Sequence, residues 1–409
     1  MIAGPALLAV ALRVPVLAAP RAAFDASAQT QALLRRLGDQ AVGEAKPAKQ
    51  SYDWQLGAGA GLLLDFRTFR LRLGYTPRLT FNDFTHQPIR NIYQTGTAGL
   101  YWTFPRLQLS LTETFAYGDK YYTSLSNLSG TDPVTGAPVV QVLPQGTTVR
   151  DLTSDTALQS DFSVSRRTLF KLFLGYQVGG GANAESRAVV AQFNSARAFA
   201  SVEHRVTPRD TLVTLAQAVD THTHPSVPPD VRVVVAGAGE QWRRQWAKGT
   251  SSSIGAGVAI VPPYDGRDGL VRPTGIASVA QVIPTGPERG SLQLGASAAA
   301  DVVIDRLTGE PDTRGQLVGS AQWNLRKWAF LGQGQFVRSF DKTTLAAVTL
   351  RSAELRVAFT PIKPLTLETG ARALKQRSLN PAVETPALLN QVQWTAFVSA
   401  TYRFDTVQW

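Results

Sequence analysis

Two histidines close to carboxylates form the group with the clearest potential for metal chemistry. His222 and His224 stand in a proline-rich stretch between Asp220 and Asp230. Imidazole nitrogens and carboxylate oxygens are ligands that zinc accepts, so this segment could bind a divalent cation. The alternative interpretation is an exposed loop in which no further residues orient the ligands. We predict no metal and no cofactor.

The common enzyme motifs do not occur in the sequence. The segment Gly57–Gly61 (GAGAG) lacks the GxGxxG spacing of a dinucleotide-binding loop, and no helical pattern follows it. We interpret it as small-residue packing or a bend in a strand. There is no Walker loop, no HExxH and no GxSxG motif, and the lack of cysteine excludes a thiol nucleophile. We therefore predict that the chain is not an enzyme.

The composition fits neither an ordinary soluble protein nor a helical membrane protein. Of the 409 residues, 44% are hydrophobic and only 17% are charged, with a net charge of +11. Soluble domains usually carry about 25% charged residues. Beyond the extreme N-terminus, no apolar run approaches the roughly 18 residues that a transmembrane helix needs. The basic residues are scattered rather than gathered in a stripe, which argues against a nucleic-acid partner.

Apolar and polar residues alternate with period two from about residue 52 onward. Such alternation predicts strands with one apolar and one polar face. The clearest example is the last segment, in which one face carries Val392, Trp394, Ala396, Val398, Ala400, Tyr402 and Phe404. Many segments have about 10 residues, which suits a tilted strand that crosses a bilayer. Because short turns alternate with long loops, we predict an all-β fold, a transmembrane antiparallel up-and-down β-barrel.

The N-terminus has the features of an export signal. Residues 2–19 are almost entirely apolar, with Arg13 as the interruption, and residues 26–28 (Ala-Ser-Ala) have the spacing of a signal-peptidase site. An earlier site near residue 18 or 19 fits as well, and a buried N-terminal helix is the alternative. We predict a signal peptide at residues 1–28, a periplasmic leader at residues 29–50 and the barrel at residues 51–409.

The strand count from the pattern alone is inconsistent. About seventeen segments can be recognised, whereas single-chain bacterial barrels have an even number of strands. The last strand must descend to the periplasm, which leaves Trp54–Leu64 without an ascending strand before it. Splitting one segment at Thr76-Pro77-Arg78 gives eighteen strands, the number we favour, and dropping a marginal segment gives sixteen.

The last segment resembles the C-terminal strand of bacterial outer-membrane β-barrels. In that family the strand alternates over about ten positions and ends on an aromatic residue, often with a tyrosine two positions earlier. Tyr402 and Phe404 match these positions, although the sequence continues to Trp409, which is also aromatic. The resemblance implies the outer membrane of a Gram-negative bacterium, recognition of this strand by the barrel-assembly machinery, and contact with outer-membrane lipid.

The polar faces of the expected strands lean toward positive charge. A basic pore would concentrate anionic or polyhydroxylated solutes. The equal alternative is that arginine and glutamate form structural ladders between neighbouring strands. The candidate pore-lining residues are Arg70, Arg72, Lys171, Arg197, Arg205, Arg232, Glu354, Arg356, Glu368, Arg372 and Arg403.

Tryptophan and tyrosine residues lie mostly toward the ends of the alternating segments. This distribution is typical of the aromatic girdles at the two membrane interfaces of a barrel. The alternative is that they stack on sugars inside the pore. The residues concerned are Trp54, Trp102, Trp242, Trp246, Trp323, Trp328 and Trp394, with Tyr52, Tyr75, Tyr101 and Tyr117.

Two classes of function remain. The first is a channel, either a general porin or an export barrel for a polysaccharide. The basic turns and the segment Gly74–Leu79 (GYTPRL) resemble eighteen-stranded barrels that accompany polysaccharide-export systems in myxobacteria-like bacteria. That resemblance implies periplasmic export components as partners. The second class is a non-transporting barrel, which would be a structural anchor, an adhesin or a lipid-modifying enzyme.

Overall fold

The alternating segments form long antiparallel strands in a computed structural model. It describes residues 21–37, 40–41, 44–45, 49–66, 68–82, 89–121, 130–131, 138–139, 148–224, 230–286, 290–305, 309–342, 347–379 and 392–408. The long strands are β1 (Arg21–Leu37), β4 (Lys49–Asp65), β5 (Phe69–Asn82), β6 (Ile89–Thr103), β7 (Leu107–Tyr121), β10 (Thr148–Ser163), β11 (Thr168–Gly181), β12 (Gln192–Arg205), β13 (Asp210–His224), β14 (Val231–Ala247), β15 (Thr250–Val261), β16 (Leu270–Pro284), β17 (Ser291–Ile304), β18 (Pro311–Asn324), β19 (Trp328–Ser339), β20 (Val348–Ile362), β21 (Leu365–Ser378) and β22 (Gln393–Arg403).

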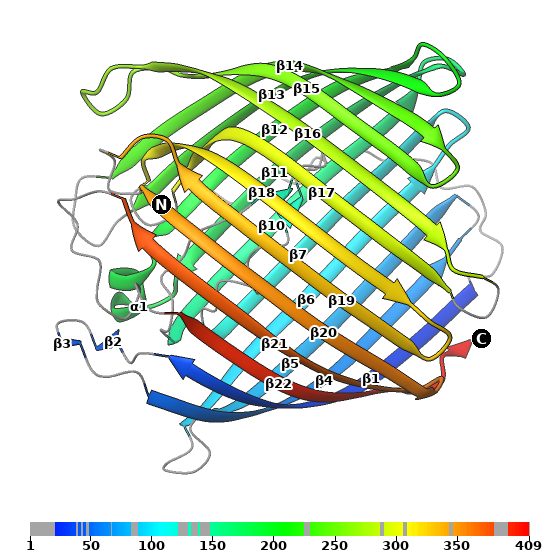
Figure 1. Cartoon of the computed structure of the whole chain (residues 1–409), viewed down its shortest axis with the longest axis vertical. Helices are drawn as coiled ribbons and strands as arrows, with labels where there is room; N and C mark the ends of the chain where they lie inside the picture. Colours follow the sequence, from blue (N-terminus) through cyan, green and yellow to red (C-terminus); the bar gives the residue numbers. More distant parts are fainter. Residues whose placement is uncertain are drawn as a thin grey trace.

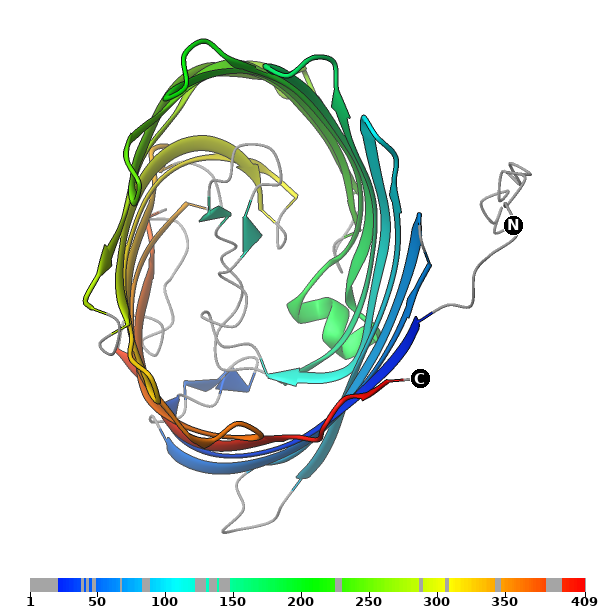
Figure 2. The ribbon, with the colours of Figure 1, turned by 90° about the vertical axis from the view of Figure 1, so that its right-hand side faces the viewer.

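The sheet closes on itself because β1 pairs with β4 along one edge and with β22 along the other. Every other long strand pairs with its sequence neighbours, so the topology is up-and-down. Figures 1 and 2 show the resulting tilted barrel from the side and along its axis. Of the nineteen strands in the sheet, one is the two-residue β23 (Val407–Gln408), which pairs with β1. The remaining eighteen confirm the predicted fold class and strand number.

The register assigns each residue to the lumen or to the outer face. Along β22, Phe397 and Ser399 are 6% and 5% exposed, whereas Val398 and Tyr402 are 61% and 42% exposed. Since successive side chains point to opposite faces, the exposed apolar set faces outward and the alternate set faces the lumen. The antiparallel pairing carries this assignment from strand to strand around the barrel.

The eighteenth strand does not come from the segment at which we divided the sequence. Strand β5 runs unbroken through Thr76, Pro77 and Arg78. Pro77 faces outward, and the pairing of β4 with β5 is interrupted beside it, where the missing N–H of proline leaves no ladder bond. The missing ascending strand is instead β1, which was assigned to the signal and the leader.

The barrel therefore begins at Arg21 and not at residue 51. Small alanines on the outward positions of β1 resemble a cleavage region, and its strand conformation follows from pairing with two distant strands. Of the expected leader at residues 29–50, residues 29–37 belong to β1, and β2 (Gln40–Ala41) pairs with β3 (Glu44–Ala45). Residues 1–20 of the expected signal peptide lie outside the described residues.

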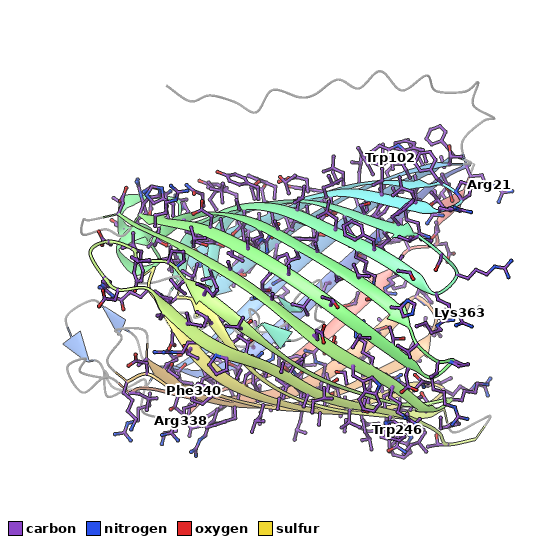
Figure 3. The ribbon with its side chains drawn as sticks, turned by 90° about the horizontal axis from the view of Figure 1, so that it is seen from above. Arg21, Trp102, Trp246, Arg338, Phe340 and Lys363 are labelled. Atoms are coloured by element: carbon purple, nitrogen blue, oxygen red, sulfur yellow. The ribbon has the colours of Figure 1, made fainter. Side chains whose placement is uncertain are left out.

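The two rims differ in the length of their connections. Short turns at one rim join β4 to β5, β6 to β7, β10 to β11 and β20 to β21. Longer segments at the other rim join β5 to β6, β7 to β10, β11 to β12 and β21 to β22. In outer-membrane barrels the short turns face the periplasm, so we assign the rim with long connections to the cell exterior. Figure 3 shows Arg21, Trp102, Trp246 and Lys363 toward the periplasmic rim and Arg338 and Phe340 toward the exterior rim.

The aromatic side chains lie mainly on the outer face. Of the eleven residues expected in girdles, all except Tyr101 have the outward register. Trp102, Trp246 and Trp328 lie near the periplasmic ends of their strands, whereas Trp394 and Tyr117 lie toward the exterior ends. This placement agrees with girdles at both interfaces rather than with sugar-stacking platforms in the lumen.

One hairpin tip folds into the barrel. Strand β17 leaves β16 after the pairing of Gly275 with Ala300, while β17 and β18 stay paired to the tip. Figure 2 shows this hairpin, in yellow, curling inside the ring of strands. The small pair β8 (Gly130–Thr131) and β9 (Pro138–Val139) also lies within the outline of the barrel. In the described part of the chain, no helix is long and apolar enough to cross a membrane, and α1 spans only Ala184–Val189.

Candidate functional site

The lumen is the candidate site, and its best-defined feature is a charge network on β20 and β21. Glu354 contacts both Arg356 and Arg372, the latter at 3.2 Å, and Arg356 also lies 3.0 Å from Glu368. Both guanidinium groups stand over the ring of Phe397, at 5.8 and 5.6 Å. These four predicted pore-lining residues therefore bind one another and form a ladder between strands.

A second group of ion pairs occupies the wall formed by β10 to β14. The carboxylate of Glu203 lies 3.0 Å from both Lys171 and Arg243. Arg197 is bound to Asp155 at 2.6 Å. The structure thus brings the predicted Lys171 and Arg197 into pairs as well, and most of the positive charge in the wall has a neighbouring carboxylate.

Three predicted pore residues face the lumen without an ion-pair partner among the described residues. These are Arg72 on β5, Arg205 at the end of β12 and Arg403 at the end of β22. Arg70 also faces inward but is paired with Asp65 at 2.9 Å, next to the periplasmic turn. The positive bias of the pore wall therefore rests on Arg72, Arg205 and Arg403 near the periplasmic end, together with Arg78 farther along β5.

The assignment of Arg232 to the pore is wrong. Its register on β14 places it on the outer face, opposite His222. There its guanidinium binds Asp220 at 2.7 and 3.1 Å. The reason for the error is that β14 is apolar on its inner face at this end, where Val233 and Val235 are buried, so its polar residue points outward.

Neutral hydrogen-bonding groups are the most numerous side chains on a broad strip of the inner wall. This strip covers β1 and β4 to β7 and also includes glycines 57, 59, 61, 74 and 99, where the backbone reaches the surface. Arg35 is paired with Asp53, and Arg70 is paired with Asp65. The described charged members of the strip on β1, β4 and β5 are Arg21, Asp25, Arg35, Asp53, Asp65, Arg70, Arg72 and Arg78. The neutral members are Ser27, Gln29, Gln31, Gln55, Thr76, Thr80, Asn91, Tyr93, Thr95, Thr97, Tyr101, Gln108, Ser110, Thr112 and Thr114.

The inward hairpin narrows the exterior half of this lumen. On the side toward the wall, Val302 packs in an apolar cluster with Val233, Val235, Ala259 and Val261 of β14 and β15. At the tip, a Cβ on Gly309 would lie 2.9 Å from the side chain of Thr223, which shows how closely the two elements meet. The hairpin is therefore packed against the wall.

Polar contacts fix the same hairpin. Arg314 binds Asp305 at 2.8 Å and Asp312 at 2.5 Å, and Ser339 of β19 donates to Asp312 at 2.6 Å. All of these side chains are buried. These residues could not be identified as site residues from the sequence. Asp305 and Arg314 come together only when β17 pairs with β18 in the folded barrel. The approximate signal is the charge-rich stretch from residue 301 to 315.

A further ion pair ties the tip to the loop between β15 and β16. Glu310 lies 2.7 Å from Arg267, and the hydrogen bond between them raises the pKa of the Arg267 guanidinium above its ordinary value. Arg267 also stands 5.8 Å from the ring of Tyr264. The inward hairpin is thus held by a buried ion pair at Arg314 and by an exposed ion pair at Arg267.

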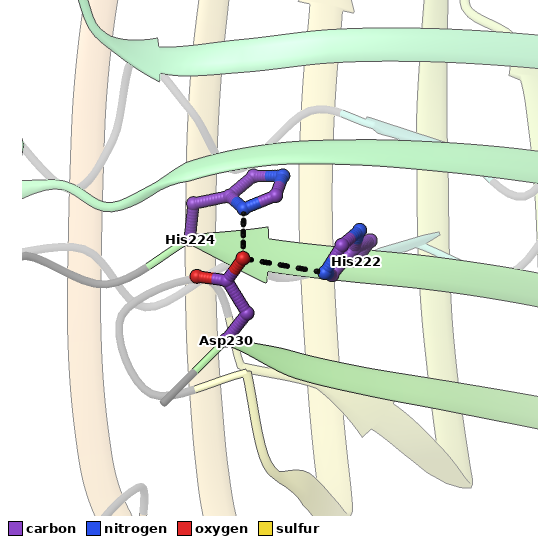
Figure 4. Close-up of side chains that lie close together, drawn as sticks. All are labelled: His222, His224 and Asp230. Carbon is purple, nitrogen blue, oxygen red and sulfur yellow. Dashed lines mark hydrogen bonds and ion pairs between the residues drawn. The ribbon is translucent and has the colours of Figure 1, made fainter. Parts of the chain in front are cut away.

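The histidine cluster lies on the outer face at the exterior rim. Figure 4 shows His222, His224 and Asp230 gathered at the end of the β13–β14 hairpin. Their ligand atoms lie within 4.8 Å of one another, and the closest contact joins His224 Nδ1 to Asp230 Oδ2 at 2.8 Å. The geometry could accept a divalent cation, but the hydrogen bond already holds the group together without one.

The proposed assembly signal occupies the periplasmic end of the seam. Tyr402 faces outward on β22, and the backbone N–H of Phe404 donates to the carbonyl of Ala26 on β1 at 2.9 Å. The two rings meet edge to face at 5.0 Å. Trp409 lies outside the described residues, although β23 beside it pairs with β1. Both ends of the chain's last segment are thus associated with the first strand.

The comparisons with known proteins agree with this architecture. Residues 16–285 match the EpsX exopolysaccharide export family. The chain belongs to this family. The match includes the wall from β1 to β16 and ends before the inward hairpin of this EpsX-family barrel. None of the curated proteins matches the sequence.

Solved structures share the fold of this EpsX-family chain at very low identity. The FrpB iron transporter from Neisseria meningitidis (F5-1 variant), as apoprotein, has a TM-score of 0.51 at 9% identity, covering 93% of this chain and 81% of that chain. A second structure of the same variant has a TM-score of 0.50 at 9% identity, covering 93% of this chain and 82% of that chain. The likeness concerns the fold alone. Together, fold and family identify a transport barrel of the Gram-negative outer membrane, as the resemblance implied.

Proposed function

We propose that the barrel exports a polysaccharide through its lumen and that the solute is a polyhydroxylated chain. The observation that carries this proposal is the neutral strip on β1 and β4 to β7. Hydroxyl and amide groups can donate and accept hydrogen bonds with sugar hydroxyls. Many weak contacts of this kind allow a chain to slide, because none of them holds a sugar unit firmly.

The charge pattern favours a polyhydroxylated solute over a small anion. Of the predicted pore cations, Lys171, Arg197, Arg356 and Arg372 have carboxylate partners within the wall. Paired charges attract a passing anion weakly because the neighbouring carboxylate repels it. This supports the ladder interpretation for most of the wall and leaves a small basic bias near Arg72 and Arg403.

The experiment is single-channel recording on refolded protein in planar bilayers. Neutral oligosaccharides of increasing length, added on the periplasmic side, should interrupt the current for times that grow with chain length. Polyanionic oligosaccharides of equal length should block no more strongly. The absence of any conductance would instead favour a non-transporting barrel, and stronger block by the polyanion would favour an anion channel.

Two substitutions in the neutral strip give a matched test. Thr95 and Thr112 face the lumen on neighbouring strands, so replacing both with valine removes two hydroxyl groups at almost constant volume. We expect shorter blocks by neutral oligosaccharides at unchanged open conductance. The control is the double replacement of Thr214 and Thr156 with valine, because these threonines face outward.

We further propose that periplasmic components of an export system dock at the rim of short turns. This rim carries the exposed basic side chains of Arg166, Arg167 and Arg326. Cells that lack the gene should lose surface polysaccharide and retain it in the periplasm. Normal surface polysaccharide in such cells would reject the export proposal while leaving the conductance result intact.

A further inference from the structure

Four cations gather on the outer face of β19 to β21 at the exterior rim. Arg351 on β20 pairs in register with Lys375 on β21, and the neighbouring Thr349 pairs with Arg338 on one side and Arg377 on the other. All four basic side chains are exposed and lie on the outward register. Adjacent strands are about 4.8 Å apart, so these charges share one small area, which we name the rim cluster.

The rim cluster differs from the other outward arginines near this rim. Arg150 is bound to Asp119 at 3.0 Å, and Arg232 is bound to Asp220 at 2.7 Å. Within the described part of the chain, no carboxylate is paired with any member of the rim cluster. Like charges directly opposite each other on a sheet are destabilising, as with Arg351 and Lys375. An external anion would remove this repulsion.

An apolar groove begins at the same place and runs along the wall below it. It has a volume of about 840 Å³ and reaches across strands β16 to β20. Its floor consists of small outward residues, and Leu317, Phe336 and Arg351 stand at its edges. The guanidinium of Arg351 lies 5.7 Å from the ring of Phe336, so one residue belongs to both the groove and the rim cluster. The small outward residues of the floor are Ala277, Ala296, Ala298, Gly319 and Gly334.

We propose that this face binds a phosphorylated glycolipid of the outer leaflet, with a phosphate on the rim cluster and an acyl chain in the groove. Arginine presents several N–H donors in a geometry that matches phosphate oxygens. The rim cluster lies at the level of the headgroups, because it is at the exterior ends of the strands, and the groove lies at the level of the hydrocarbon. The order of charge and apolar surface along the barrel wall therefore matches the order of parts in the lipid.

Other occupants fit less well. Free phosphate would satisfy the cations but leave the groove empty. A second copy of the barrel would have to present a carboxylate group beside an apolar ridge. On the outer face near this rim, Asp119 and Asp220 are already paired with arginines, and Asp230 is paired with His224. A lipid with phosphate and acyl chains supplies both parts in one molecule.

The test is direct measurement of lipid binding to the full chain in mild detergent by native mass spectrometry. The probe is lipid A with two phosphates, compared with the same lipid after phosphate removal and with inorganic phosphate alone. We expect retention of one lipid A per barrel at low concentration. Binding of the dephosphorylated lipid should be at least tenfold weaker.

Matched variants separate the charge from the fold. In the double variant Arg351→Ala with Lys375→Ala, lipid A binding should weaken at least tenfold. The control is Arg150→Ala with Arg232→Ala, which removes the same number of outward arginine or lysine charges at the same rim. It should bind normally. Heat-dependent mobility on a denaturing gel confirms that each variant is a closed barrel.

The groove is tested independently of charge. A Cβ on Gly319 would meet no heavy atom within 4 Å, so Gly319→Leu should fold while filling the groove. It should weaken lipid A binding severalfold. Gly96 has the same open surroundings on the outward face of β6, and Gly96→Leu is the control.

Three results would overturn the proposal. These are equal lipid binding by the Arg351/Lys375 variant and its control, equal binding of phosphorylated and dephosphorylated lipid, or a Gly319→Leu variant that binds as well as wild type. Competition by inorganic phosphate at the lipid's own concentration would mean an adventitious ion only. A dimer that dissociates in the Arg351/Lys375 variant would mean that a second copy covers this face.

Discussion

Arg314 and Asp305 are bound at 2.8 Å inside the barrel, and their side chains are only 5% and 4% exposed. The pair joins the two strands of the inward hairpin just below its tip. Asp312 accepts from the same guanidinium and from Ser339, so the group also connects the hairpin to β19. A buried charge without its partner is costly, so this arginine stabilises the hairpin position together with the packing of Val302 and the Arg267–Glu310 ion pair.

Replacing Arg314 with methionine should release the hairpin from its inward position. The change removes the guanidinium group that Asp305 and Asp312 share, at a cost of about 3–5 kcal/mol. We expect a larger and noisier single-channel conductance, together with a lower temperature of barrel unfolding. Arg326→Met, at an exposed periplasmic turn, is the control. A conductance that stays at the wild-type value would show that this hairpin does not limit the pore.

Ion selectivity should depend on the inward arginines that have no carboxylate partner. Reversing the charge of Arg72 and Arg403 should lower the anion-to-cation permeability ratio by at least about twofold. The reversal potential in a salt gradient measures this ratio. Arg326→Glu is the control for a general change in charge at the periplasmic rim. Unchanged reversal potentials in the Arg72/Arg403 variant would reject any basic bias of the pore.

Glu354 should matter for stability more than for selectivity. It is the carboxylate shared by Arg356 and Arg372, so Glu354→Gln leaves two inward arginines with one partner fewer. We expect destabilisation of about 3–5 kcal/mol, because the carboxylate is buried, and it should appear as a lower unfolding temperature. Glu368→Gln is the milder comparison, since Glu368 contacts Arg356 alone. Equal unfolding temperatures for wild type and Glu354→Gln would contradict the ladder interpretation.

The periodic pattern predicted the fold but not where all of it begins. Alternation is visible in a strand such as β22, whose outward positions include Trp394, Val398 and Tyr402. Strand β1 has alanines at many of the corresponding positions, which local sequence cannot distinguish from a cleavage region. Its conformation is decided by pairing with β4 and β22, partners far along the chain. The even strand number was therefore predictable, whereas the identity of the eighteenth strand was not.

The pore wall was predictable as a face and not as a set of interactions. Lys171 and Arg356 lie on the inward register of β11 and β20. Their ion-pair partners depend on the register between neighbouring strands. A shift of one strand by a single residue would turn all its side chains to the opposite face. The assignment of Arg232 to the pore was wrong because a charged residue was expected to face the lumen. The inner side of β14 is apolar at that end, so Arg232 faces outward. The inward position of the hairpin was not predictable, because the charge-rich stretch at residues 301–315 reads equally well as an exposed loop.

The position of β1 leads to a prediction for signal processing. Cleavage after residue 28 would remove Arg21–Ala28, which is half of β1, and expose the edges of β4 and β22. Cleavage near residue 18 or 19 would leave β1 whole. We expect mass spectrometry of the protein from outer membranes to place the mature N-terminus before Arg21. A mature chain that begins at Gln29 would contradict this and would require a different closure of the barrel.

The last segment allows the assembly signal to be located. Phe404 is bound through its backbone to Ala26, whereas Val407 and Gln408 form β23 against β1. If Tyr402 and Phe404 carry the signal, as the resemblance to outer-membrane barrels implies, Phe404→Ala should lower the yield of heat-modifiable barrel in membranes severalfold. A chain ending at Phe404 should assemble normally, since it keeps both aromatic residues. If instead Trp409→Ala reproduces the assembly defect and Phe404→Ala does not, the machinery reads the final residue.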